Sequence, residues 1–149
     1  MTTITDALRG EHGVLYRLLD HLDTRIAGVT AETARELGAL LAAAVEAHAH
    51  VEDDLLFVEL ETVLGKTAGP LVVMRHEHAE IERDLAALAS AADAEAARRI
   101  AARLVDTARG HFAKEEQVLF PLAERSLTAA RLGELGQAWA ERSAVALAR

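Results

Sequence analysis

Apolar residues recur every three or four positions along most of this chain, and turn-forming residues interrupt the recurrence at four places. This spacing puts the apolar side chains on one face of an α-helix. The expected helices cover approximately residues 5–26, 30–65, 70–90, 94–125 and 128–148. The first begins after Thr5 or Asp6, both good N-caps. The pattern therefore predicts an all-α fold in which four helices form a bundle and a C-terminal helix packs on its outside.

A small set of polar residues lies on the apolar faces of the first four helices, where a soluble bundle would otherwise hold leucine. The set consists of His12, His48, Glu52, His78, His111 and Glu115. Buried imidazoles and carboxylates are costly unless something pairs with them. Two cations at the centre would satisfy all of these side chains at once, so the pattern predicts a metal centre.

The pattern of these residues occurs twice in the chain. Segment 48–57 carries a His-x-x-x-Glu pair, then an acidic residue, and ends in Leu-Phe; segment 111–120 repeats it. The Glu-His pair at 11–12 returns at 77–78 with the same apolar and basic positions after it. The chain is thus two related helical hairpins, which predicts a pseudo-twofold site with two metal ions.

A His-x-x-x-Glu pair suits a two-metal site because residues four apart on a helix differ by about 40° around the axis and about 6 Å along it. The imidazole can bind one metal while the carboxylate bridges to the second. Four imidazoles and two bridging carboxylates then give each metal two nitrogen and two oxygen ligands. Such a set nearly fills tetrahedral zinc but leaves open positions on iron or manganese, and we favour iron.

The other polar residues near these motifs are expected at the surface. His21, His50 and His76 lie off the apolar faces. Asp53, Asp54 and Glu116 form a solvated acidic face, with Glu116 as the alternative to Glu115 if the fourth helix is slightly rotated.

Tyr16, the only tyrosine, lies one turn after His12 on nearly the same face. The pattern favours a half-buried tyrosine whose hydroxyl is satisfied elsewhere. The alternatives are a hydrogen bond to a metal ligand, or direct binding to the metal, and either would give Tyr16 a part in catalysis.

Composition narrows the classes of function. The 149 residues fit one domain over 1–149, and a net charge of −8 argues against nucleic acid or an anionic membrane as partner. There is no cysteine, which excludes disulfides, thiolate zinc sites and iron-sulfur clusters. No apolar run approaches the roughly 20 residues of a membrane span, and residues 1–6 show no targeting signal. We therefore expect a cytoplasmic protein.

Together these motifs resemble the hemerythrin family, and more closely its bacterial HHE cation-binding branch. The resemblance covers residues 6–125 and rests on the Glu-His pairs at 11–12 and 77–78 and on the runs 48–57 and 111–121. It implies an up-down antiparallel four-helix bundle around a non-haem di-iron centre. The two irons would share an oxo or hydroxo bridge, with zinc or manganese less favoured. The implied ligands are His12, His48, Glu52, His78, His111 and Glu115.

Two departures from oxygen-carrying hemerythrins bear on function. Those proteins have a His-x-x-x-His pair in the third helix, whereas Met74 and Glu82 flank His78 here at that spacing. They also place the fourth-helix carboxylate five residues after the histidine, whereas Glu115 comes four after His111. Fewer histidines leave both irons open, which favours reaction over reversible oxygen carriage. The Glu-x-x-His signature of ferritin-like proteins does not occur.

The leading hypothesis is a di-iron protein that reacts with peroxide, nitric oxide or oxygen in oxidative or nitrosative defence, acting as a weak oxidoreductase. The alternative is a non-enzymatic oxygen or iron sensor or carrier that uses the same site. A third is a helical interaction protein with a vestigial site. The expected partner is a small oxidant or diatomic gas, and the sequence leaves the oligomeric state open.

Overall fold

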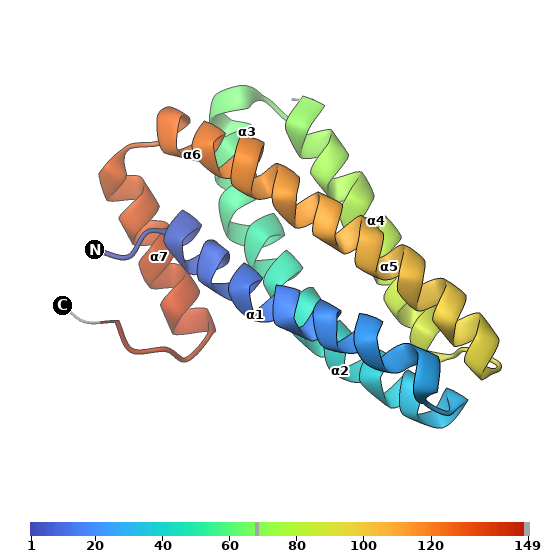
Figure 1. Ribbon diagram of the computed structural model, residues 1–149. Helices are drawn as coiled ribbons and strands as arrows, with labels where there is room; N and C mark the ends of the chain where they lie inside the picture. Colours follow the sequence, from blue (N-terminus) through green and yellow to red (C-terminus); the bar gives the residue numbers. More distant parts are fainter. Residues whose placement is uncertain (68, 148–149) are drawn as a thin grey trace.

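The computed structural model describes residues 1–67 and 69–147, which form α-helices joined by short turns and contain no β-strand. The four long helices, which run up and down beside one another, are α1 (Ile4–Arg25), α2 (Ala31–Val51), α4 (Gly69–Ala89) and α5 (Ala94–Lys114) (Figure 1). Three shorter helices are α3 (Val58–Leu64), α6 (Phe120–Ser126) and α7 (Ala129–Arg142). The prediction of an all-α bundle with an additional C-terminal helix is confirmed.

Side-chain caps fix where the helices begin. Thr30, Asp93 and Thr128 each accept a hydrogen bond from a backbone N–H in the first turn of α2, α5 and α7. The first helix begins earlier than the expected cap at Thr5 or Asp6. Thr3 caps it instead, because its hydroxyl accepts from the Asp6 N–H while the Asp6 carboxylate accepts from the Thr3 N–H. This reciprocal capping box satisfies two backbone donors.

Helix α7 lies across the end of the bundle where α1 begins (Figure 1). Gly136 allows this close approach, because a Cβ atom there would lie 2.2 Å from the Thr2 carbonyl oxygen. The helix ends at Arg142, before the expected end near residue 148, which is outside the described residues. Ala144 adopts a φ of 54°, and the Val145 N–H donates to the Ala140 carbonyl, which closes the helix with a Schellman motif.

Two π-helical segments interrupt the long helices at equivalent positions. One, η2 (Glu52–Phe57), joins α2 to α3, and the other, η3 (Glu115–Leu119), joins α5 to α6. Each begins at the glutamate of a His-x-x-x-Glu pair. Short π-helical segments are rare and occur frequently at functional sites. The sequence repeat therefore extends to the backbone geometry, which helical periodicity alone did not predict.

The buried side chains form two apolar clusters. The loop cluster, near the α1–α2 and α4–α5 connections, includes Leu19, Leu85 and Leu88. The terminal cluster, near the start of the chain and α7, includes Leu8 and Phe120. The polar residues predicted as ligands lie between the two clusters along the helices. None of the described helices is long and apolar enough to cross a membrane.

Candidate metal centre

Each long helix brings one predicted histidine ligand into a single buried layer, and each π-helical segment brings one glutamate. The ligands are His12 on α1, His48 on α2, Glu52 at the start of η2, His78 on α4, His111 on α5, and Glu115 at the start of η3. Both glutamates are completely buried, and no histidine of the set is more than 6% exposed. The apolar face of each helix puts these residues inside the bundle, and the similar distances to the shared loops put them at one level.

The layer divides into two groups of four that share both carboxylates. His12 and His48 form one group with Glu52 and Glu115, and His78 and His111 form the other with the same two glutamates. The ligand atoms of each group lie within 4.8 Å of one another. This is the arrangement expected of two metal positions with two nitrogen and two oxygen ligands each.

Each carboxylate turns one oxygen toward each group. Glu52 Oε1 lies 3.4 Å from His48 Nε2, and its Oε2 lies 3.3 Å from His78 Nε2. Glu115 Oε2 lies 3.1 Å from His12 Nε2, and its Oε1 lies 2.9 Å from His111 Nε2. Each glutamate is therefore oriented so that it would bridge two metal ions held by the two groups.

Four further carboxylates, which we call the second ring, surround the layer and orient the imidazoles. The Nδ1 atoms of His12, His48 and His111 lie 2.8, 2.6 and 2.9 Å from carboxylate oxygens of Glu116, Glu11 and Glu77. His78 Nδ1 lies 3.3 Å from an oxygen of Asp53. A carboxylate can only accept, so Nδ1 donates, and in a neutral imidazole Nε2 then turns its lone pair toward the layer.

The inner atoms of the layer lack partners that would satisfy them. Among the described residues, all four carboxylate oxygens of Glu52 and Glu115 are buried without a hydrogen bond, as are the Nε2 atoms of His78 and His111. The Nε2 atoms of His12 and His48 face each other at 3.1 Å. Two lone pairs at this distance repel unless a proton or a metal ion lies between them. The donor set fits two cations, because every partnerless atom is a ligand to divalent metals.

Charge in the layer shows what takes the place of metal in its absence. Burial alone would lower the pKa of His48, but Glu52 and Glu11 raise it to about 10. Burial likewise opposes the charged form of His78, while Asp53, Glu115 and Glu52 raise its pKa to about 11. Without metal His48 and His78 therefore hold protons at neutral pH, and metal binding must displace these protons.

The structure places the remaining candidates outside the two groups. The surface positions expected for His21, His50 and His76 are confirmed, since all are exposed. Tyr16 is half-buried, with its ring edge-on to His12 at 6.2 Å between centroids. Burial raises the pKa of its phenol, and the charge of Glu116 raises it further. Tyr16 therefore lies beside the second ring.

The expectation of a solvated acidic face was wrong for two of its three members. Asp53 and Glu116 are only about one-third exposed and each pairs with a histidine of the layer, whereas Asp54 is exposed. Glu115, with no exposed surface, occupies the layer, and Glu116 lies behind His12. Sequence reasoning missed the second ring, although the repeat of one acidic residue after each ligand glutamate was a usable signal.

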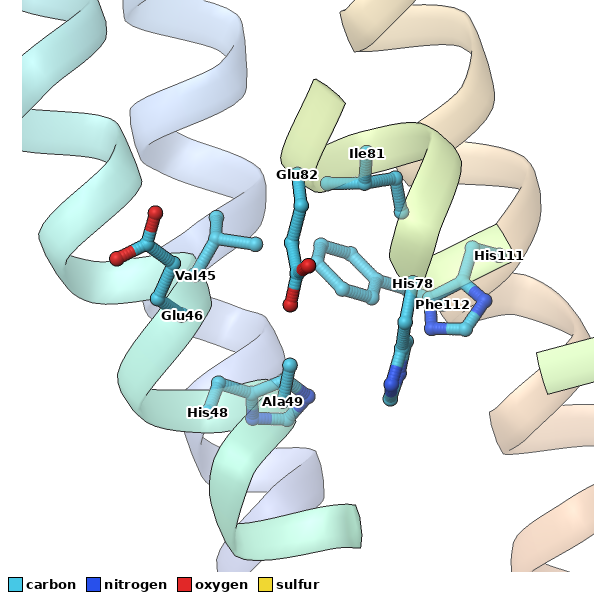
Figure 2. A pocket seen from close by; sticks show the side chains of 9 residues that line it. All are labelled: Val45, Glu46, His48, Ala49, His78, Ile81, Glu82, His111 and Phe112. Carbon is cyan, nitrogen blue, oxygen red and sulfur yellow. The ribbon is translucent and has the colours of Figure 1, made fainter. Parts of the chain in front are cut away.

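A small cavity of about 10 Å³ adjoins the layer between α2, α4 and α5. His48, His78 and His111 line it, together with apolar side chains that include Ile81. Figure 2 shows the carboxylate of Glu82 pointing toward this cavity, whereas that of Glu46, which also lines it, points away. The volume is close to the minimum that holds one water molecule.

One family model matches the chain, described as the hemerythrin HHE cation binding domain, over residues 3–123 and again over 70–146. The two matches overlap, as expected when the second hairpin of a chain repeats the first. No curated protein and no solved structure matches the chain.

Proposed function

The chain belongs to the hemerythrin HHE cation-binding domain family, and from this premise we propose that it holds two iron ions and reacts with a small oxidant in oxidative or nitrosative defence. One observation carries the proposal. The layer contains two groups of two imidazoles that share two carboxylates, and most of its inward-facing atoms have no partner in the described chain. Protein that never bound metal would have no physical reason to keep this arrangement.

The ligand types favour iron. Imidazole and carboxylate without thiolate suit iron and manganese, and four ligands for each ion leave octahedral positions open. A pair of iron(II) ions can supply the two electrons that, with two protons, reduce one hydrogen peroxide to two waters. The role of the protein is then to hold both ions side by side, to orient the imidazoles through the second ring, and to exclude bulk water with the two apolar clusters.

The cavity supports a small reactant. Its volume of about 10 Å³ has room for little more than one water molecule, which favours the smallest reactants, such as nitric oxide, oxygen or peroxide, and three of the four layer histidines line it. A larger organic substrate would require α2 and α4 to separate. Hence we propose a small oxidant or diatomic gas as the partner and not an organic metabolite.

A second function is favoured by the position of α7. The indole N–H of Trp139 donates to Glu11, the carboxylate that also accepts from His48 Nδ1. Metal binding at His48 is therefore connected to the C-terminal helix by two hydrogen bonds. An oxygen or iron sensor could use this connection to report on the metal, and a carrier module would need only the metal site.

Iron loading followed by turnover assays tests the proposal. Anaerobically loaded protein should contain about two iron ions per chain by elemental analysis. Each reduced iron pair should then consume one peroxide or two nitric oxide molecules, and an added chemical reductant should sustain the consumption, measured with electrodes against iron-free protein. One tightly bound zinc with no iron would refute the di-iron site. Reversible oxygen binding with no net consumption of either reagent would replace the defence role with the carrier or sensor.

A further inference from the structure

The second ring differs between the two metal positions, although the ligands are equivalent. Glu11 accepts from His48 Nδ1 at 2.6 Å and from the Trp139 indole N–H at 2.7 Å. Its counterpart Glu77 accepts from His111 Nδ1 at 2.9 Å and forms an ion pair with Lys114. One carboxylate therefore has a neutral second donor, and the other has an ammonium group.

The second pair of outer carboxylates differs in the same direction. Glu116 lies 2.8 Å from His12 Nδ1, a normal hydrogen-bond length. Asp53 lies 3.3 Å from His78 Nδ1, which is beyond the usual range for this type of bond. The histidines of one metal position thus have two close carboxylate partners. The histidines of the other position have a distant carboxylate, Asp53, and a carboxylate whose charge Lys114 neutralises, Glu77.

These contacts change how strongly an imidazole binds metal. A carboxylate that accepts from Nδ1 makes Nε2 a more basic ligand, and loss of such a partner typically lowers metal affinity about 10- to 100-fold. A cation on the same carboxylate draws negative charge away from the imidazole and weakens the effect. Both differences therefore strengthen His12 and His48 relative to His78 and His111.

We propose that the two metal positions are unequal: the position of His12 and His48 binds a divalent cation tightly, and the position of His78 and His111 is the weaker, exchangeable one. Trp139 and Lys114 are the positioning residues that set this difference, acting through Glu11 and Glu77. The inference rests on the proposed two-metal site. The cavity agrees with it, because both histidines of the weaker position line the cavity but only one of the stronger position does.

The first arm of the test locates the first ion. Zinc is a suitable probe because it is diamagnetic and takes nitrogen and oxygen ligands. One equivalent of Zn²⁺ added to the metal-free full-length protein should shift the imidazole ¹⁵N resonances of His12 and His48. The second equivalent should shift those of His78 and His111. Conservative His→Gln variants assign the resonances.

The second arm measures the two stepwise zinc affinities by competition with a chromophoric chelator. Repulsion between neighbouring cations weakens the second binding step in any two-metal site. The affinities of the variants, and not those of the unaltered protein alone, therefore test the inequality. Lys114→Met should strengthen the second step about tenfold and leave the first unchanged, because Glu77 regains its full charge. Trp139→Phe should weaken the first step alone, because Glu11 loses the indole N–H that holds it in position beside His48. The matched control is Lys66→Met, at the only other lysine of the chain, which is exposed and should change neither step.

The outcomes separate this inference from the proposed function. The protein could bind two zinc ions while the first equivalent divides evenly between the two positions or goes to His78 and His111. Either result would overturn the inequality and leave the two-metal site intact. The same holds if Lys114→Met shifts both steps equally or neither. Binding of only one zinc ion, together with an iron content below two, would remove the two-metal site and the inference with it.

Discussion

Buried carboxylates occur in two regions of this bundle, and they are compensated in different ways. Asp84, beside the loop cluster, is 7% exposed and accepts three hydrogen bonds of 2.6 to 3.1 Å from the guanidinium group of Arg103. Glu52 and Glu115, in the ligand layer, are completely buried, and neither has an arginine or lysine partner among the described residues. Their neighbours are imidazoles, which are themselves candidate ligands.

The difference shows which charges the chain balances by itself. Arg103 reaches Asp84 while its own side chain stays 60% exposed, so this pair costs little desolvation. No equivalent cation within residues 1–67 and 69–147 reaches the layer, where imidazolium protons or bound metal can compensate the glutamates. Stability near Asp84 should therefore be independent of metal, and stability of the layer should depend on it.

Metal removal should produce the largest effect. A ligand that binds only the folded state at 1,000 times its Kd contributes about 4 kcal/mol for each site, so chelation should lower the free energy of unfolding by several kcal/mol. Thermal unfolding of iron-loaded protein with and without a chelator measures this. Equal midpoints would mean that the layer is stable without metal and would break the contrast with Asp84.

Removal of one ligand should come next. His48→Ala should lower the iron content well below two ions per chain, because one metal position loses half of its nitrogen ligands. His50→Ala is the matched control, since His50 lies two residues further on and is exposed. Elemental analysis of both variants decides the point. A His48→Ala protein with two tightly bound ions would contradict the assignment of this ligand.

The Asp84 pair should respond in the opposite manner. Arg103→Ala should cost about 1–3 kcal/mol, the typical penalty for an unpartnered buried polar group, and the cost should be the same with and without metal. Arg99→Ala, which removes an exposed pair with Glu95, should cost less than about 0.5 kcal/mol. Denaturant unfolding in both metal states measures these values. A cost for Arg103→Ala that depends on metal would show that the two regions are coupled.

Much of the difference between the ligand layer and the Asp84 pair could be predicted from the sequence. Histidine and glutamate in place of leucine on an apolar face identify the layer, because burial follows from helical periodicity alone. The choice between Glu115 and Glu116 needed the structure. Adjacent residues lie about 100° apart on a helix, and the π-helical segment that begins at Glu115 changes the local register.

The repeat points to Asp53 and Glu116 as equivalent residues, but spacing could not predict which histidines the second ring contacts. Asp53 and Glu116 are acidic residues on the edge of a helix, like many solvated ones, and their partners are 25 and 104 residues away in the sequence. The contact of Trp139 with Glu11 depends on where α7 docks, and the periodicity of α7 shows only which of its faces is apolar. Long-range partners of half-exposed polar groups are decided by tertiary packing.

A further effect concerns pH and separates the metal-free from the metal-loaded state. The pKa of His48 is raised to about 10, against about 6.5 in an unfolded chain. The folded metal-free protein thus keeps a proton that the unfolded chain loses, so this stabilisation is complete below about pH 6.5 and is lost as pH rises toward 10. Bound metal displaces the proton, and the slope should disappear. Unfolding curves from pH 6.5 to 10 in both states test this; a slope that persists with metal would contradict it.

The smallest expected effect is that of Tyr16→Phe, which probes the border between the layer and its surroundings. The phenol lies beside Glu116, the carboxylate behind His12, and its ring contacts Phe112 edge-on at 5.7 Å. Phenylalanine keeps these ring contacts, so stability should change by less than about 0.5 kcal/mol and the iron content should stay at two. If the hydroxyl acts through Glu116 and not on the metal, peroxide consumption should slow by less than about tenfold. The rate, the absorption spectrum and the iron content of the variant decide between three roles. A slower rate with two irons means that the hydroxyl acts through Glu116, and an unchanged rate and spectrum mean that Tyr16 has no part in the chemistry. Loss of one iron would mean that Tyr16 is itself a ligand.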